Sequence, residues 1–143
     1  MRAALLLVLV ACAGAPPRTV TVGIDLPPEV RVAAWNARER WCAAVGYCPE
    51  LVAFGGDGFV RVRRFGDDWI AAAHQTRDLI EVSPLWLDHD LTGAMLHEWG
   101  HFGIDGEVES SWLMKARHAD EADFPDVPDP AAIEAWCAQQ GCG

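Results

Sequence analysis

The sequence predicts an α+β domain, and three patterns carry that prediction. Alternating apolar and polar residues over Thr19–Asp25 predict a half-buried strand. Apolar residues at helical spacing over Glu29–Val45 predict a long amphipathic helix. Three more strand-like stretches follow, and then two shorter helical ones. At 143 residues the chain has room for one domain with a substantial core.

Composition narrows the classes of function. Hydrophobic residues make up 51% and charged residues 22% of the chain, an ordinary globular balance. The formal net charge of −10 argues against a nucleic-acid partner, because phosphate binding needs a basic surface. We therefore expect a globular protein that acts on something other than nucleic acid. We also expect it to be a monomer.

The N-terminus predicts export. Ala3–Val10 is an apolar run after Arg2, too short to cross a bilayer but typical of a signal peptide over residues 1–11. Leu9–Cys12 resembles a bacterial lipobox, in which the cysteine is lipidated, and residues 12–18 would then form a tether to a domain over 19–143. The expected location is the bacterial cell envelope, with lipid-mediated membrane attachment at Cys12. A plain secretory signal is the alternative, and it leads to the same exported domain.

The other four cysteines agree with an oxidising compartment. They form two close pairs, one near each end of the domain, which predicts the disulfides Cys42–Cys48 and Cys137–Cys142. Other connectivities are open on spacing alone. A four-cysteine metal site is disfavoured, because neither pair has the C-x₂-C spacing of such sites.

Turn signals divide the rest of the first half. Pro27-Pro28 ends the first strand and can open the long helix, which Gly46 then ends. Gly55–Gly58 predicts a turn. The three strands expected after it are Phe59–Arg64, Trp69–Gln75 and Asp78–Val82.

A second helix is predicted over Leu91–Phe102. Asp90 occupies the N-cap position, and Gly103 follows where a helix would end. A core-facing stripe runs along it, made of Leu91, Met95, Trp99 and Phe102. After a turn-like segment at Ser110–Met114 and a proline-rich loop at Phe124–Pro130, a last helix is expected over Ala131–Gln140.

The second helix carries a metal-binding pattern. His97 and His101 lie four positions apart, so their imidazoles share one face of the helix. With Glu98 they form the H-E-x-x-H arrangement of zinc hydrolases, in which the histidines bind Zn²⁺. Glu98 can reach a water molecule beside the metal, take its proton during attack on a carbonyl, and pass that proton to the leaving nitrogen.

With this pentad and Ser111-Trp112-Leu113-Met114, the chain resembles a small bacterial matrixin-like metzincin protease. The resemblance implies a zinc-dependent endopeptidase acting on peptide or protein substrates. It also implies a small twisted mixed sheet packed on the long helix and the active-site helix, with a short C-terminal helix. Met114 would lie beneath the metal, and Asp78–Val82 would be an edge strand that pairs with extended substrate.

The third zinc ligand departs from the metzincin pattern, which has a histidine at position 107. Glu107 stands there, and a carboxylate is an acceptable ligand, so it is the expected third donor. Three other candidates stay open: Asp105, His118 and Glu121.

The abnormal third position also motivates a rival hypothesis. In it, the chain is a catalytically degenerate protease-like domain that serves as an envelope binding or structural lipoprotein. The remaining histidines fit simpler roles: His74 is expected to be packed within a strand, and His89 to be a surface or capping residue.

Overall fold

The computed structural model describes residues 14–63, 71–73, 78–115 and 124–142, so the predicted signal peptide and Cys12 lie outside the described residues. The described elements confirm the α+β class. In chain order they are β1 (Thr19–Val22), α1 (Pro28–Val45), β2 (Glu50–Val52), β3 (Gly58–Val62), β4 (Ala71–Ala73), β5 (Leu79–Val82), the 3₁₀ turn η1 (Pro84–Trp86), α2 (Thr92–Gly100) and α3 (Pro130–Gln140).

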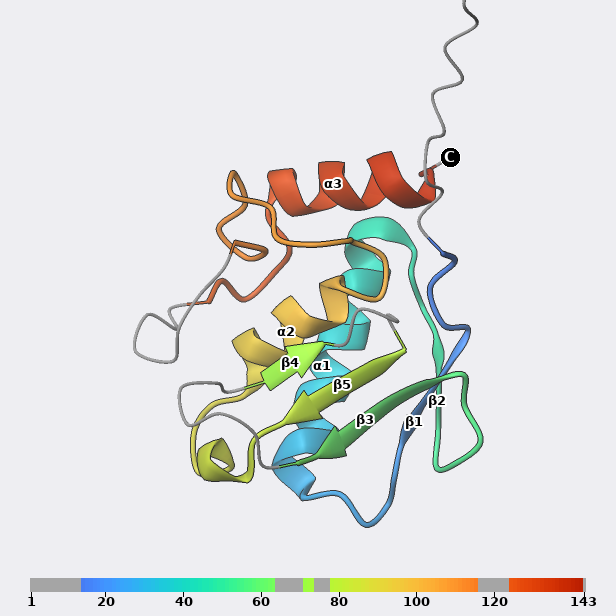
Figure 1. Ribbon diagram of the computed structural model, residues 1–143, viewed down its shortest axis with the longest axis vertical. Coiled ribbons are helices and arrows are strands. Elements are labelled where there is room, and N and C mark those ends of the chain that lie inside the picture. The colour runs from blue at the N-terminus through green and yellow to red at the C-terminus, as the bar shows by residue number, and fades with distance from the viewer. Residues whose placement is uncertain (1–13, 64–70, 74–77, 116–123, 143) are drawn as a thin grey trace, which may run out of the picture.

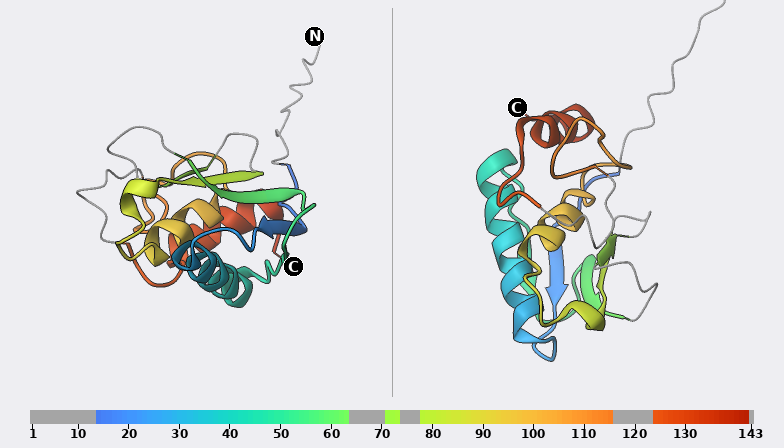
Figure 2. Two further views of the ribbon diagram at one scale, coloured as in Figure 1. Left: turned by 90° about the horizontal axis from the view of Figure 1, so that it is seen from below. Right: turned by 90° about the vertical axis from the view of Figure 1, so that its left-hand side faces the viewer.

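The strands form one mixed sheet in the order β2-β1-β3-β5-β4. Strands β2, β1, β3 and β5 run parallel to one another, and β4 runs antiparallel to β5. Helices α1 and α2 pack on one face of this sheet, whereas α3 lies across the end of the molecule near the C-terminus of α1 (Figures 1 and 2). The C-terminal part of α2 is therefore enclosed by the sheet, by α1 and by the segments leading to α3.

The first strand is shorter than predicted. It ends at Val22, and the chain then turns through a hydrogen bond from the Leu26 amide to the Gly23 carbonyl, 3.1 Å long. Val20 is fully buried, as the alternation predicts, but Ile24 lies beyond the strand and is 79% exposed. The alternating pattern thus continues past the residues that pair in the sheet.

Two expectations about the sheet were wrong. No strand was expected at Glu50–Val52, yet β2 pairs with β1 there, with Leu51 opposite Val20. Asp78–Val82 was expected to be an edge strand, but β5 lies between β3 and β4, with Glu81 opposite Ala72. The edge beside β5 is occupied by β4, so β4 is the outer strand on this side of the sheet.

Helix α1 begins at Pro28, one residue before its predicted start, and ends at Val45 as predicted. Pro28 occupies its first turn, and Gly46 ends it in the left-handed conformation at φ 74°, which glycine adopts without steric cost. Its buried face is Val30, Ala33, Ala34, Ala37 and Trp41. The small residues on this face allow α1 to approach α2 closely, and Trp41 fastens the two helices by donating from Nε1 to the Leu96 carbonyl at 2.9 Å.

Both predicted disulfides are present, Cys42–Cys48 and Cys137–Cys142. Tyr47 lies inside the first disulfide loop, and its hydroxyl donates to the Pro17 carbonyl at 2.9 Å. Its ring packs on Trp136 of α3, which in turn packs on Trp41, with ring centroids 4.9 and 5.0 Å apart. This aromatic cluster joins α3 to the C-terminal end of α1.

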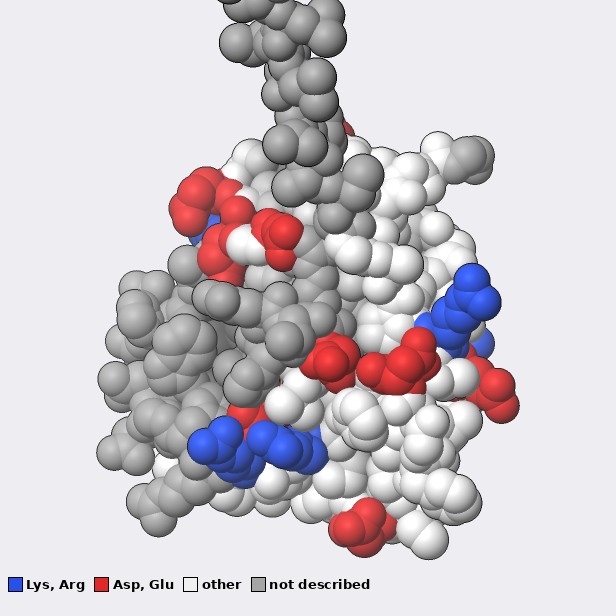
Figure 3. All heavy atoms as spheres, turned by 45° about the vertical axis from the view of Figure 1, so that its right-hand side comes forward, with Lys and Arg blue, Asp and Glu red and all other residues white. Residues whose placement is uncertain are grey.

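Charged side chains on the described surface are dispersed. Figure 3 shows acidic side chains in several separate groups on one face, with basic side chains beside some of them. Among the ion pairs, Arg61 and Arg63 both reach the buried carboxylate of Glu81, at 2.7 and 3.2 Å. In the part of the chain that the structure describes, the helices do not combine the length and apolar character needed to cross a membrane.

Candidate metal centre

Helix α2 is shorter than its predicted range of Leu91–Phe102. It begins at Thr92, and its N-cap is Leu91, so the prediction that Asp90 would occupy the N-cap position was wrong by one residue. Asp90 still contributes to the start of the helix, because its Oδ1 accepts from the Thr92 amide at 2.9 Å. It ends at Gly100, because the backbone then tightens: the Phe102 and Gly103 amides donate to carbonyls three residues back. The tightened turn directs the chain after His101 back across the end of the helix.

The predicted core stripe of α2 is buried in full, and the histidine side is also enclosed. Leu91, Met95, Trp99 and Phe102 are each at most 3% exposed, while His97 is 6% and Glu98 8% exposed. Gly100 explains the close packing below the histidines, since a Cβ there would lie 2.5 Å from Met114 Sδ. Met114 is thus packed directly against the last turn of α2, fully buried.

The two imidazoles are oriented by backbone carbonyls. His97 Nδ1 lies 2.6 Å from the Leu113 carbonyl, and His101 Nδ1 lies 3.2 Å from the Ile104 carbonyl. A carbonyl can only accept, so each Nδ1 carries the proton and each Nε2 is left as the free nitrogen of a neutral ring. These two Nε2 atoms face each other at 3.2 Å. Two lone pairs at that distance repel unless a proton or a cation lies between them.

Glu107 faces the same point. Its Oε2 lies 3.6 Å from His97 Nε2, and its Oε1 lies 3.6 Å from His101 Nε2. Donors about 2.1 Å from a tetrahedral zinc ion lie about 3.4 Å apart, close to the three separations found here. Two imidazoles and one carboxylate also form a donor set that zinc accepts. The residues present therefore fit a metal ion in composition and in spacing.

The pKa shifts of His101 and Glu107 both favour positive charge at this point. Burial lowers the pKa of His101, but the Glu107 carboxylate facing its ring and the negative charge of Glu98 outweigh that effect, so the pKa is raised. For Glu107, burial raises the pKa, but the facing imidazoles of His101 and His97 outweigh that effect and the net pKa is lowered. The carboxylate is thus held ionised, and positive charge is favoured between the rings.

Glu98 lies beside the histidines. The ligand atoms of His97, Glu98 and His101 are all within 4.8 Å of one another, so this group could hold a metal ion. Glu98 is 8% exposed, so its carboxylate is largely shielded from bulk water. A buried carboxylate in that position can accept a proton from a water molecule bound between it and the imidazoles.

Of the other predicted ligand candidates, Asp105 is the one that lies within the described residues. Asp105 is exposed, and its amide donates to Gln139 Oε1 at 2.7 Å. The tight group of possible ligands consists of His97, Glu98 and His101 and includes neither Asp105 nor Glu107, but Glu107 lies 3.6 Å from each Nε2. His118, Glu121 and His74 lie outside the described residues. His89 is a surface residue, as expected, with Nδ1 2.8 Å from Asp88 Oδ1.

Three contributions to the site were not predicted from the sequence. The Phe124 ring packs edge-on against His97, with centroids 5.7 Å apart, and Gly93 provides the room for it on α2. The Leu113 carbonyl and the Asp129 carboxylate are the other two. Asp129 directly before Pro130 is a recognisable helix start, but its contacts to the segment 111–113 are non-local and leave no signal in the sequence.

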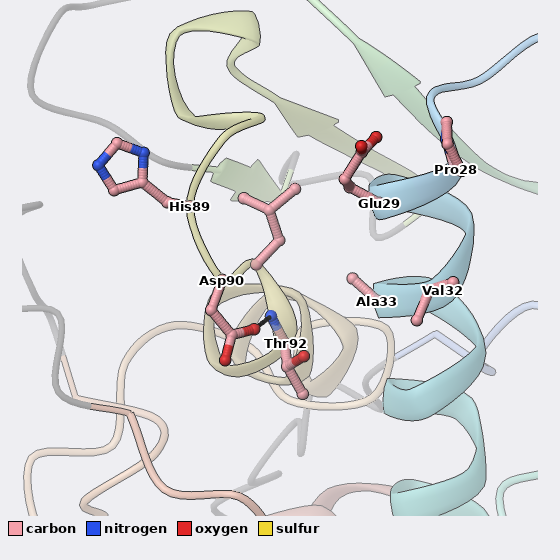
Figure 4. Close-up of a pocket in the computed structure, with 8 residues that line it drawn as sticks. Pro28, Glu29, Val32, Ala33, His89, Asp90 and Thr92 are labelled. Carbon is pink, nitrogen blue, oxygen red and sulfur yellow. Dashed lines mark hydrogen bonds between the residues drawn. The ribbon is translucent and has the colours of Figure 1, made fainter.

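A separate hollow of about 380 Å³ lies between the first turns of α1 and α2. Figure 4 shows its lining, which includes Glu29, Val32, His89 and Thr92, with Thr92 bonded to Asp90. It opens at the N-terminal end of α2, whereas the histidines occupy the C-terminal half. The hollow is therefore distinct from the candidate metal centre.

Comparison of the chain with protein-family models and with curated proteins found no match. The case for a function therefore depends on the geometry of the site.

Proposed function

We propose that this protein is a zinc-dependent endopeptidase of metzincin type. The observation that carries the proposal is the convergence of His97, His101 and Glu107, whose donor atoms lie 3.2–3.6 Å apart, with the Glu98 carboxylate beside them. The packing of Met114 against Gly100 in the last turn of α2 supports the proposal. The two disulfides are consistent with an exported protein.

Zinc held by these three side chains would supply Lewis-acid polarisation of a carbonyl and acidify a nearby water molecule. The chain's own residues supply the rest of the chemistry. Glu98 takes the proton from the attacking water and then donates it to the departing amine nitrogen. His97 and His101 are held in the Nδ1–H tautomer by their carbonyl partners, so both present Nε2 to the same point.

The test is zinc content and peptide hydrolysis measured on the same preparations. Purified protein should bind one zinc ion per chain and hydrolyse an unstructured protein such as casein. Glu98→Gln should keep the zinc and lose hydrolysis by at least about 100-fold, because general base catalysis contributes on that order. His97→Ala should lose both, because it removes a ligand.

Glu109→Gln is the matched control, since Glu109 is an exposed acid two residues beyond Glu107. It should leave zinc content and hydrolysis at the wild-type level. If the wild-type protein binds no stoichiometric zinc, the proposal is wrong. If zinc binds but no substrate is cleaved, the result contradicts the endopeptidase proposal and supports the rival hypothesis of a catalytically degenerate binding or structural domain.

A further inference from the structure

Asp129 joins helix α3 to the segment that follows α2. Asp129 is the N-cap of α3, and its Oδ1 accepts from the Ala132 amide at 2.9 Å. The rest of its hydrogen bonds leave the helix. Ser111 Oγ donates to Oδ1 at 2.9 Å, the Leu113 amide donates to Oδ2 at 3.0 Å, and the Trp112 amide also donates to Oδ2.

The segment held by Asp129 is a closed loop, here called the 108–114 loop. The Val108 amide donates to the Met114 carbonyl at 2.9 Å, and the Met114 amide donates to Ser111 Oγ at 2.8 Å. Ser111 is 1% exposed, so the hydroxyl that links the loop to Asp129 is buried. The loop is thus fastened at its ends and, through Asp129, to α3.

Both ends of this loop contact the candidate metal centre. Glu107 directly precedes the loop and lies 3.6 Å from each imidazole Nε2. At the other end, Leu113 donates through its amide to Asp129 and accepts through its carbonyl from His97 Nδ1. A displacement of Leu113 would therefore move the group that sets the His97 tautomer.

The charge state of Asp129 suits this role. Burial raises its pKa, but the hydrogen bonds from Ala132, Leu113, Ser111 and Trp112 outweigh that effect, and the pKa is lowered. The carboxylate is therefore ionised at neutral pH. An ionised acceptor makes stronger hydrogen bonds than a neutral one, which fits an anchor for several donors.

We propose that Asp129 is a positioning residue of the metal centre, which holds the 108–114 loop where Leu113 orients His97 and Glu107 faces both imidazoles. The part of this inference that concerns zinc rests on the proposed function. The part that concerns His97 does not, because the hydrogen bonds exist in the metal-free chain. Asp129 acts through Leu113 and the loop, and it does not touch the donors itself.

The test compares Asp129→Ser with Glu134→Gly. Serine is also a good helix cap but is too short to hold the loop, so Asp129→Ser separates the two roles of the carboxylate. Glu134→Gly weakens α3 at an exposed position without touching the loop. Zinc affinity is measured by competition with a chelator, and the His97 tautomer by ¹⁵N–¹H correlation spectra of the metal-free protein.

Asp129→Ser should weaken zinc binding by about 10- to 100-fold, the usual effect of losing an outer partner of a metal ligand. It should also shift His97 from the Nδ1–H tautomer toward a mixture. Glu134→Gly should change neither. Should Asp129→Ser not fold, Ser111→Ala removes a loop bond to Asp129 while leaving the cap, and a smaller change in both readouts is expected.

The inference is overturned if the folded variants keep wild-type zinc affinity and the Nδ1–H tautomer, or if Glu134→Gly reproduces their effect. The two proposals fail separately. A wild-type protein that binds no zinc contradicts the proposed function, while the tautomer comparison still decides the role of Asp129.

Discussion

His97 and His101 illustrate how backbone groups can build a site for a cation. Each ring gives its Nδ1 proton to a carbonyl, at Leu113 and at Ile104. The geometry thus brings the Nε2 lone pairs of two largely buried rings together with the carboxylate of Glu107, whose side chain is 40% exposed. Such an arrangement is costly without a positive charge, because the two imidazoles are largely removed from water and their lone pairs face each other and a carboxylate.

The pH dependence of stability should reveal the anchoring role of Asp129. Its pKa is lower in the folded protein than the ordinary value of 3.8, so the unfolded chain binds the proton first as the pH falls. The contribution of this carboxylate to the free energy of unfolding is therefore fully present above about pH 5. It is lost as the pH falls through 3.8 toward the folded-state pKa. Asp129→Asn should reduce the free energy of unfolding by about 1–3 kcal/mol at pH 7.

Urea unfolding of wild type and Asp129→Asn at several pH values between 3 and 7 measures this difference. The gap between the two proteins should narrow below pH 4, where the wild-type carboxylate loses its charge. A gap that stays constant down to pH 3 would show that the ionised form of Asp129 is not what holds the loop.

Gly100→Ala should destabilise the protein although alanine is the better helix former. The added Cβ would lie 2.5 Å from Met114 Sδ and 2.8 Å from the Trp41 ring. Overpacking of this kind costs about 1–3 kcal/mol, which exceeds the gain of about 1 kcal/mol in helix propensity. In a Met114→Ala background the same substitution should cost less, because the sulfur is absent. Equal costs in the two backgrounds, from thermal unfolding, would contradict the packing argument.

At the scale of elements, α3 is attached at both ends. Asp129 fastens its start to the 108–114 loop, and the disulfide Cys137–Cys142 closes its last turn beyond Trp136. The aromatic contacts of Trp136 with Trp41 and Tyr47 lie between these attachments. Helix α3 therefore connects the aromatic cluster of Trp41, Tyr47 and Trp136 to the 108–114 loop beside the histidines.

Replacing Cys137 and Cys142 together with serine should separate these attachments. The bond closes a short loop, with a sequence separation of 5, so its loss should lower the free energy of unfolding by about 2 kcal/mol. Zinc affinity should stay within about 2-fold of wild type, since the Asp129 end of α3 is unchanged. Chemical denaturation and chelator competition measure the two effects. A loss of zinc binding comparable to that of Asp129→Ser would mean that the helix acts as one rigid unit.

The sequence predicted elements whose signals are local. The bounds of α1 follow from Pro28 and Gly46, and α3 follows from Pro130. Glu50–Val52 was missed because three residues carry no periodicity, and its pairing with β1 is set across an intervening helix. The prediction that β5 would be an edge strand was wrong because β4 folds back and pairs antiparallel with its outer side. That pairing leaves no local signal in the sequence.

The site divides in the same way. The grouping of His97, Glu98 and His101 follows from helical geometry alone, because all three lie within five consecutive residues. Glu107 was predicted as the third donor by its spacing, and it lies 3.6 Å from both rings, while its role as a ligand stays a prediction. Phe124 and Asp129 could not be predicted, because long-range packing brings them to α2 and to the 108–114 loop.

For the whole molecule, zinc binding and folding should be coupled. The donors come from α2 and from the chain beyond its tightened end, so the complete set exists only in the folded state. Zinc at 100 times its dissociation constant should stabilise the protein by about 2.7 kcal/mol, or roughly 10 °C in Tm, and a chelator should reverse this. Glu107→Gln should bind zinc more weakly and show a smaller rise at the same zinc concentration, since an amide is a poorer ligand than a carboxylate.

Glu109→Gln makes the same change of charge on an exposed neighbour and should show the wild-type rise in Tm. Scanning calorimetry with and without zinc compares the three proteins. A Tm that does not respond to zinc in the wild type would contradict the metal centre as a whole. An equal rise in wild type and Glu107→Gln would leave the two histidines as ligands and remove Glu107 from the set, because a donor that binds the metal must contribute to the affinity that drives the shift.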